Sequence, residues 1–79
     1  MIMELKDFIE NFSAQFDDTD ASEFTADAKF KELDEWSSLV ALSVISMVDD
    51  EYGKSISGDV IRNSTTIEDL FNQIKALDD

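Results

Sequence analysis

The chain has 79 residues, with 19 acidic and 6 basic side chains, a formal net charge of −13, and neither cysteine nor histidine. A chain of this length forms a single domain, residues 1–79, and its charge argues against nucleic acid or anionic membranes as partners, because both would repel it. Without cysteine there is no disulfide or zinc–thiolate site, and without histidine the commonest general base and metal ligand are absent.

Hydropathy and charge together favour a folded cytoplasmic protein. Hydrophobic residues make up 43% of the chain and recur at regular spacing, which argues against disorder. No apolar run approaches the ~20 residues that a membrane span needs, and residues 1–10 lack the basic start and apolar core of a signal peptide. We therefore expect a cytoplasmic monomer without membrane insertion. The acidic surplus is either a solvated surface or one that attracts basic partner proteins.

An apolar stripe with helical spacing opens the chain. Its members fall at i, i+3, i+4, i+7 and i+11: Leu5, Phe8, Ile9, Phe12 and Phe16. The stripe predicts a helix over about residues 3–16, with the phenylalanines in the core. Acids at positions 17, 18 and 20 are unfavourable at the negative end of a helix, so we expect the helix to end there.

Residues 17–37 predict a long first loop, since no extended periodic pattern runs through them. We expect a short helical turn near residues 26–31, and three apolar side chains that hold the loop against the core: Phe24, Phe30 and Leu33. A calcium-binding loop beginning at Asp18 is excluded, because Glu23 and Lys29 stand where glycine and glutamate are required. We predict no metal site.

A second helix is predicted from Ser38 to Tyr52. A serine just before an apolar segment is a helix N-cap signal, so Ser37 or Ser38 lies at the positive end of the helix dipole, where an anion would be favoured. The same serine is also expected if this segment is only a capped and buried helix without a functional site. Gly53 suits the position that follows the helix end.

This second helix is apolar over much of its circumference. One of its faces carries Leu39, Leu42 and Ile45. A helix that is apolar all round is normally buried, which is hard to achieve in so small a domain. Two alternatives stay open at this point: either Val40, Ala41 and Val44 remain exposed as a docking surface, or the first loop covers them.

The C-terminal part predicts one short and one longer helix. Residues 57–62 can form only a short helix. Thr65, three residues before Glu68, has the pattern of a capping box ahead of a helix over about residues 66–77, with the stripe Ile67, Leu70, Phe71, Ile74 and Leu77. The sequence thus predicts an all-α fold: a small up-and-down bundle of three main helices and one short helix, with a long first loop.

The chain carries little of what catalysis needs. A nucleophilic serine requires a base to take its proton, and the sequence has no histidine and no lysine near Ser38. No pair of carboxylates is singled out for acid–base work. We therefore predict no catalytic residues, and no enzymatic activity for the isolated chain.

The sequence Ser37-Ser38-Leu39, followed by an apolar helix, resembles the Asp-Ser-Leu site of acyl and peptidyl carrier proteins. The resemblance continues without a gap to the acidic-aromatic end of the family's second helix, its short third helix and the start of its fourth, at residues 49–53, 56, 59–62 and 65–70. It implies that Ser38, directly before Leu39, carries 4′-phosphopantetheine. An acyl or aminoacyl group would be held on that arm as a thioester and delivered between biosynthetic enzymes.

Three positions depart from the family pattern. Ser37 stands where the family commonly has aspartate, and Val40 and Ser43 replace acids two and five positions after the modified serine. The acids at the end of the helix are retained as Asp49, Asp50 and Glu51. These differences favour specialised partners, in a lipid, polyketide or related pathway, with more apolar contacts near the serine.

The resemblance implies two kinds of partner, a phosphopantetheinyl transferase and acyl- or aminoacyl-handling enzymes with basic surfaces. The residues expected to contact them are Trp36, Ser37, Leu39, Val40, Val44, Asp49, Asp50, Glu51 and Ile61. Trp36 packs either beside the arm or under the first loop as a partly buried anchor. The alternative function is an acidic helical interaction module without a prosthetic group, which has the same charge and fold.

Overall fold

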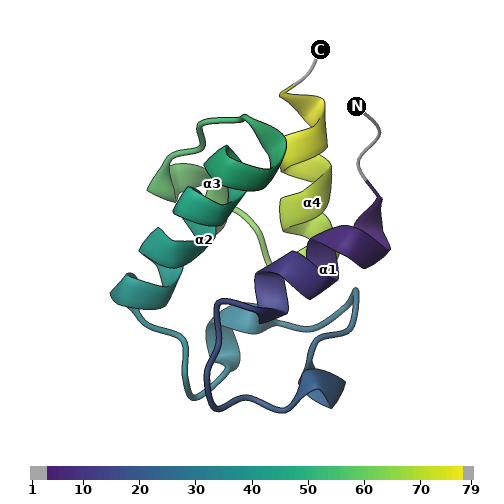
Figure 1. Cartoon of the computed structure of the whole chain (residues 1–79), viewed down its shortest axis with the longest axis vertical. Coiled ribbons are helices and arrows are strands. Elements are labelled where there is room, and N and C mark those ends of the chain that lie inside the picture. The colour runs from purple at the N-terminus through teal and green to yellow at the C-terminus, as the bar shows by residue number, and fades with distance from the viewer. Residues whose placement is uncertain (1–3, 78–79) are drawn as a thin grey trace.

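The computed structural model describes residues 4–77, and every regular element in that range is helical. The helices are α1 (Leu5–Ser13), α2 (Ser38–Tyr52), α3 (Gly58–Arg62) and α4 (Ile67–Ala76), with two short 3-10 turns in the first loop, η1 (Ala21–Glu23) and η2 (Phe30–Glu32). α1 contacts α2 and α4, and α3 contacts the same two helices (Figure 1). The prediction of a small all-helical fold with three main helices, one short helix and a long first loop is confirmed.

α1 is shorter than predicted, since it ends at Ser13 and not near residue 16. One looser turn follows, in which the backbone N–H of Gln15 donates to the Phe12 carbonyl at 3.1 Å and that of Phe16 to the Ser13 carbonyl at 3.0 Å. The last turn of α1 has no basic residue to offset the helix dipole, and the first acids after it, Asp17 and Asp18, come only after the looser turn. The predicted start at residue 3 lies outside the described residues.

The core is built around phenylalanine. Rings of α1 meet rings of the first loop and of α4: the centroids of Phe12 and Phe30 are 5.3 Å apart, and those of Phe8 and Phe71 are 5.6 Å apart. Such tilted and edge-on pairs add stability beyond the area that they bury. As predicted, the phenylalanines are core side chains, and each fully buried one contributes about 1.5–3 kcal/mol through the hydrophobic effect.

Apolar side chains hold the first loop against this core, as predicted. Phe24 and Phe30 are buried, and Leu33 is partly buried and packs against the same cluster. The helical turn expected near residues 26–31 lies slightly later, at η2, and η1 was not predicted.

The start of α4 is capped one residue later than the sequence predicted. The Thr66 hydroxyl accepts the backbone N–H of Asp69 at 3.1 Å, and the Asp69 carboxylate accepts the backbone N–H of Thr66 at 3.3 Å. This is a capping box, so the one predicted from Thr65 and Glu68 was wrong by one position.

The first loop explains this position of the cap. The backbone N–H groups of Ile67 and Glu68, which follow the cap, donate to the loop carbonyls of Ala28 and Ala26 at 3.2 and 2.9 Å. With Thr66 as cap, the orphan donors at the start of α4 therefore all find acceptors. The predicted stripe is buried at Ile67, Leu70, Phe71 and Ile74, whereas Leu77 is exposed beyond the end of the helix.

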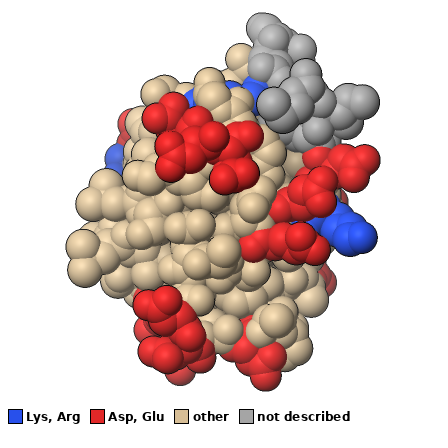
Figure 2. Space-filling model, in the orientation of Figure 1, with Lys and Arg blue, Asp and Glu red and all other residues tan. Residues whose placement is uncertain are grey.

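The acidic surplus lies on the surface. Among residues 4–77 no Asp or Glu is buried. On the side of the molecule drawn in Figure 2, acidic side chains form separate groups with a broad uncharged area between them. Electrostatic repulsion is therefore spread over the molecular surface, and part of that surface is left without charge.

Candidate functional site at the start of α2

The two serines before the apolar segment have different positions. Ser37 is the N-cap residue of α2, with extended backbone (φ −156°, ψ 173°), and its hydroxyl accepts the backbone N–H of Val40 at 3.3 Å. Ser38 is the first helical residue and is exposed. Within residues 4–77 nothing hydrogen-bonds to the Ser38 hydroxyl. Both serines are exposed, but the Ser37 hydroxyl is engaged in capping α2 whereas the Ser38 hydroxyl is not.

The start of α2 also differs from the start of α4 in where its backbone donors point. In α4 the first two helical N–H groups donate to carbonyls of the first loop. In α2 the corresponding N–H groups, of Ser38 and Leu39, have no acceptor within the described part of the chain. Unsatisfied donors at a helix N-terminus favour a negative charge, so this end of α2 suits an anion on Ser38.

A hollow of about 390 Å³ lies beside Ser38, and we name it the Ser38 hollow. It is formed by η2, the start of α2 and α3, and its lining residues are Lys31, Trp36, Ser37, Ser38, Ala41, Gly58, Ile61 and Arg62. Ile61 was expected to contact a partner protein, but it is only 4% exposed. It belongs to the wall of this hollow and offers no surface to a partner. The reason is that α3 packs against α2 and α4, which covers Ile61.

Trp36 joins the first loop to the Ser38 hollow. Its ring is stacked near Phe16, with centroids 6.3 Å apart, and meets Phe30 edge-on at 5.0 Å. The side chain is only partly buried, and it also lines the hollow. Both alternatives left open by the sequence are therefore compatible with its position: Trp36 anchors the first loop and borders the space next to Ser38.

The exposed apolar face of α2 is not the one that the sequence suggested. Val44, which was expected to contact a partner and which the sequence left either exposed or covered, is 0% exposed, whereas Leu39 and Leu42 are 77% and 59% exposed. Val40 and Ala41 are partly buried against the core. The cause is the packing of α2 on α1 and α3, which covers the side of the helix that carries Val44 and the next-turn residues Met47 and Val48.

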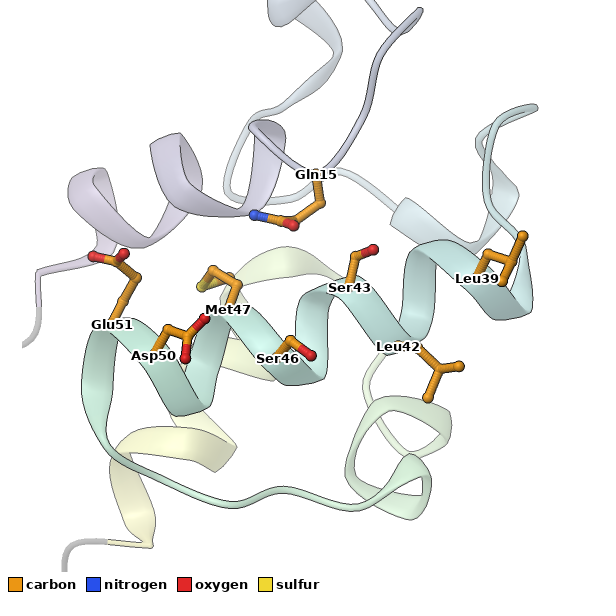
Figure 3. A pocket seen from close by; sticks show the side chains of 8 residues that line it. All are labelled: Gln15, Leu39, Leu42, Ser43, Ser46, Met47, Asp50 and Glu51. Atoms are coloured by element: carbon orange, nitrogen blue, oxygen red, sulfur yellow. The ribbon is translucent and has the colours of Figure 1, made fainter.

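The exposed side of α2 changes from apolar to polar to acidic along the helix, and we name it the α2 face. It runs from Leu39 and Leu42 through Ser43 and Ser46 to Asp50 (Figure 3). Leu42 was missed as a candidate partner contact. Ser43 and Ser46 follow Leu39 and Leu42 at a spacing of four residues, and these polar residues are the signal in the sequence that marks this side as solvent-exposed.

The three acids at the end of α2 are exposed, as a docking role requires. Asp49, Asp50 and Glu51 lie in the last turn, roughly 16–20 Å from Ser38 at 1.5 Å per residue. Figure 3 shows Glu51 and Asp50 at one end of the α2 face and Leu39 at the other. The helix thus offers an apolar end near Ser38 and an acidic end far from it.

Glu35 ties the first loop to the segment that leads into Ser38. Its carboxylate accepts the backbone N–H groups of Asp17 and Asp18 at 2.7 and 3.0 Å, and the Thr19 hydroxyl at 2.7 Å. These hydrogen bonds, above all the one from Thr19, hold the pKa of Glu35 below its usual range. The two ends of the first loop are therefore joined one residue before Trp36.

Within residues 4–77, no group of three or more Asp or Glu side chains is arranged to hold a metal ion. In the same range, no helix has the length and apolar character needed to cross a membrane.

Comparison with protein-family models, curated proteins and solved structures found no match for this chain. A function has to be inferred from the residues around Ser38.

Proposed function

We propose that this chain is a cytoplasmic carrier protein whose Ser38 is the attachment site of 4′-phosphopantetheine. It would deliver an acyl or aminoacyl group between enzymes of a specialised lipid, polyketide or related pathway. The observation that carries the proposal is the exposed Ser38 hydroxyl on the first residue of α2, next to a serine that takes the capping role. The resemblance of this segment to the Asp-Ser-Leu site of carrier proteins supplies the identity of the group.

The surroundings of Ser38 fit such a group. The positive end of α2 favours the negative phosphodiester, and the adjacent Ser38 hollow offers space of about 390 Å³. When bound, the arm supplies a thiol that can hold an acyl group as a thioester, a function that this cysteine-free chain has no side chain to perform. The chain itself contributes position and recognition, and tethering raises the concentration of the cargo at a docked enzyme.

The proposed partners are a phosphopantetheinyl transferase and acyl- or aminoacyl-handling enzymes with basic surfaces. The acids at the end of α2 complement a basic surface, and Leu39 and Leu42 can enter an apolar depression near the point of attachment. The chain would turn over no substrate by itself.

Loading with coenzyme A and a phosphopantetheinyl transferase tests the proposal. The wild-type chain should gain the mass of one phosphopantetheinyl group, and Ser38→Ala should gain none. Ser37→Asp is the matched control: it keeps an N-cap acceptor, so α2 remains capped, and it should load like the wild type. A loaded Ser38→Ala chain, or a wild-type chain that takes no group, would contradict the assignment.

A second candidate function is favoured by the composition of the α2 face. Two exposed leucines beside an acidic helix end would form a docking surface for a basic protein without any modification. In that case Ser38→Ala would bind its partners as well as the wild type does. A carrier that has lost its attachment site keeps its docking surface but no longer transfers cargo, so a transfer assay separates the two functions.

A further inference from the structure

The Ser38 hollow has an unusual charge for this protein. Four surface hollows can be compared within residues 4–77, and the other three include two, four and three carboxylate side chains in their lining. The Ser38 hollow is lined by two cations, Lys31 and Arg62, and by no carboxylate. The whole chain has only 6 basic residues against 19 acids. The lining therefore carries positive charge, offset only in part by Asp59, whose carboxylate pairs with Arg62 from outside the lining, and an anion is repelled less here than beside the acidic hollows.

We propose that Lys31 and Arg62 bind the phosphodiester of the arm on Ser38, so that the arm leaves the serine through the Ser38 hollow and not along the α2 face. This inference rests on the proposed function. It adds two phosphate-binding residues and a direction for the arm, and it concerns side chains that lie outside the serine motif itself.

The two cations come from separate elements that are joined at this point. The Lys31 ammonium, from η2, donates to the backbone carbonyl of Arg62 at 2.9 Å, and Arg62 is the last residue of α3. The Arg62 guanidinium pairs with the Asp59 carboxylate through one of its nitrogens. A guanidinium has five N–H donors and an ammonium has three, so each side chain retains donors for phosphate oxygens.

Charge also decides between the two routes that begin at Ser38. The alternative route runs along the α2 face, which borders Leu39 and ends at Asp50 and Glu51, with no cation in its lining. In the Ser38 hollow the arm would meet Trp36, Ala41 and Ile61, whose apolar surfaces suit the uncharged part of pantetheine. An arm placed there leaves Leu39 and Leu42 available to a docked enzyme.

The test compares two double variants with the same loss of charge. Lys31→Gln with Arg62→Gln removes the proposed phosphate contacts, and Lys6→Gln with Lys29→Gln removes two exposed cations elsewhere. Each chain is loaded with coenzyme A and a transferase, and loading is verified by intact mass. The readouts are the change in Trp36 fluorescence on loading, and the shifts of the Ala41 and Ile61 amide signals between the unloaded and loaded chains in two-dimensional NMR.

We expect loading to shift the Trp36 emission and the Ala41 and Ile61 signals in the wild type and in the control variant. The Lys31→Gln, Arg62→Gln variant should load at Ser38 but lose most of these shifts, and salt should reduce the wild-type shifts because it screens the ion pairs. Loaded chains in which the Ala41 and Ile61 signals do not move, or move equally in both variants, would overturn this inference alone. A wild-type chain that gains no mass would overturn the proposed function, and this inference with it.

Discussion

At the scale of single residues, two neighbouring serines have different positions at the start of α2: Ser37 caps the helix and Ser38 is its first residue. The sequence could predict that a serine caps this helix, because the signal lies in a few adjacent residues. It could not decide between Ser37 and Ser38, since the cap is the residue whose backbone is still extended when its neighbour is already helical. The resemblance to carrier proteins selected Ser38 on separate grounds, and the structure leaves that serine exposed.

The role of Glu35 in joining the two ends of the first loop could not be predicted from the sequence. Its hydrogen-bond partners lie 16 to 18 residues earlier, in a loop without periodicity, so only the path of the folded chain brings them together. The same holds for the contacts of Ala26 and Ala28 with the start of α4.

Replacing Glu35 with glutamine should change how stability depends on pH. Because hydrogen bonds lower the pKa of Glu35 in the folded chain, its ionised form adds stability above the usual glutamate pKa. That stability is lost as the pH falls through the folded-state pKa. Glu35→Gln should therefore be less stable than the wild type near pH 7, and the difference should shrink under acid conditions, as urea unfolding at a series of pH values would measure.

Glu32→Gln is the control for this experiment, because it removes the same charge at an exposed position in η2. It should not reproduce the loss near neutral pH. If both variants follow the same pH profile, the effect belongs to net charge, and the hydrogen bonds to Asp17, Asp18 and Thr19 contribute nothing measurable.

At the scale of elements, the apolar pattern of α2 predicted the helix itself but not which of its sides is buried. The apolar residues predicted the existence and limits of this helix correctly, from Ser38 to Tyr52, because both depend on local sequence. Which side faces inward depends on where α1 and α3 pack, and a helix that is apolar nearly all round gives little guidance. The sequence therefore left Val44 either exposed or covered, and the partner contact expected of it was wrong because the side chain is buried, although Ser43 and Ser46 marked the solvent side.

Truncating one side chain on each face of α2 should separate core from surface. Val44→Ala removes buried methyl groups and should cost about 1.5–3 kcal/mol of unfolding free energy, including the cavity that it leaves. Leu42→Ala, on the exposed face, should stay within about 0.5 kcal/mol of the wild type. Urea titrations of both variants measure this, and similar losses at the two positions would contradict the assignment of faces.

The two ends of the α2 face should act on different rate constants for a docked enzyme, measured with the transferase that loads Ser38. Changing Asp49, Asp50 and Glu51 to lysine should slow association, by roughly tenfold at low salt, because these exposed acids steer the encounter. Leu39→Asp with Leu42→Asp should instead speed dissociation, since it removes apolar contact. Both variants must first show wild-type helix content by circular dichroism.

The reverse outcomes are informative. An acid-to-lysine variant that associates at the original rate in low salt would mean that the end of α2 is a solvated surface and not a docking site. A leucine variant that dissociates at the original rate would exclude the α2 face as the apolar contact.

At the scale of the whole molecule, the sequence predicted the class of fold and the order of its helices. The reason is that each stripe of apolar residues specifies one amphipathic element, and in a chain of 79 residues few arrangements bury all of them. The Ser38 hollow could not be predicted, because it arises where η2, the start of α2 and α3 meet. Its charge likewise depends on Lys31 and Arg62, which are far apart in sequence.

The acidic surplus should make stability depend on salt. Among residues 4–77 the acids are all at the surface, so the folded state carries much of the repulsion of a net charge of −13. Raising the salt from about 0.01 M to about 0.1 M shortens the Debye length from about 30 Å to about 10 Å, which should raise the melting temperature. A flat or falling melting temperature over that range would show that repulsion does not limit the stability of this fold.

The most direct test of the carrier proposal is to locate the modified residue in the loaded wild-type chain. Fragmentation mass spectrometry can resolve the adjacent residues Ser37 and Ser38. The account predicts one phosphopantetheinyl group per chain, on Ser38 and on no other residue, because Ser38 combines an exposed hydroxyl with the open start of α2. A chain that stays unmodified, or that carries the group on Ser37 or any other residue, would contradict it.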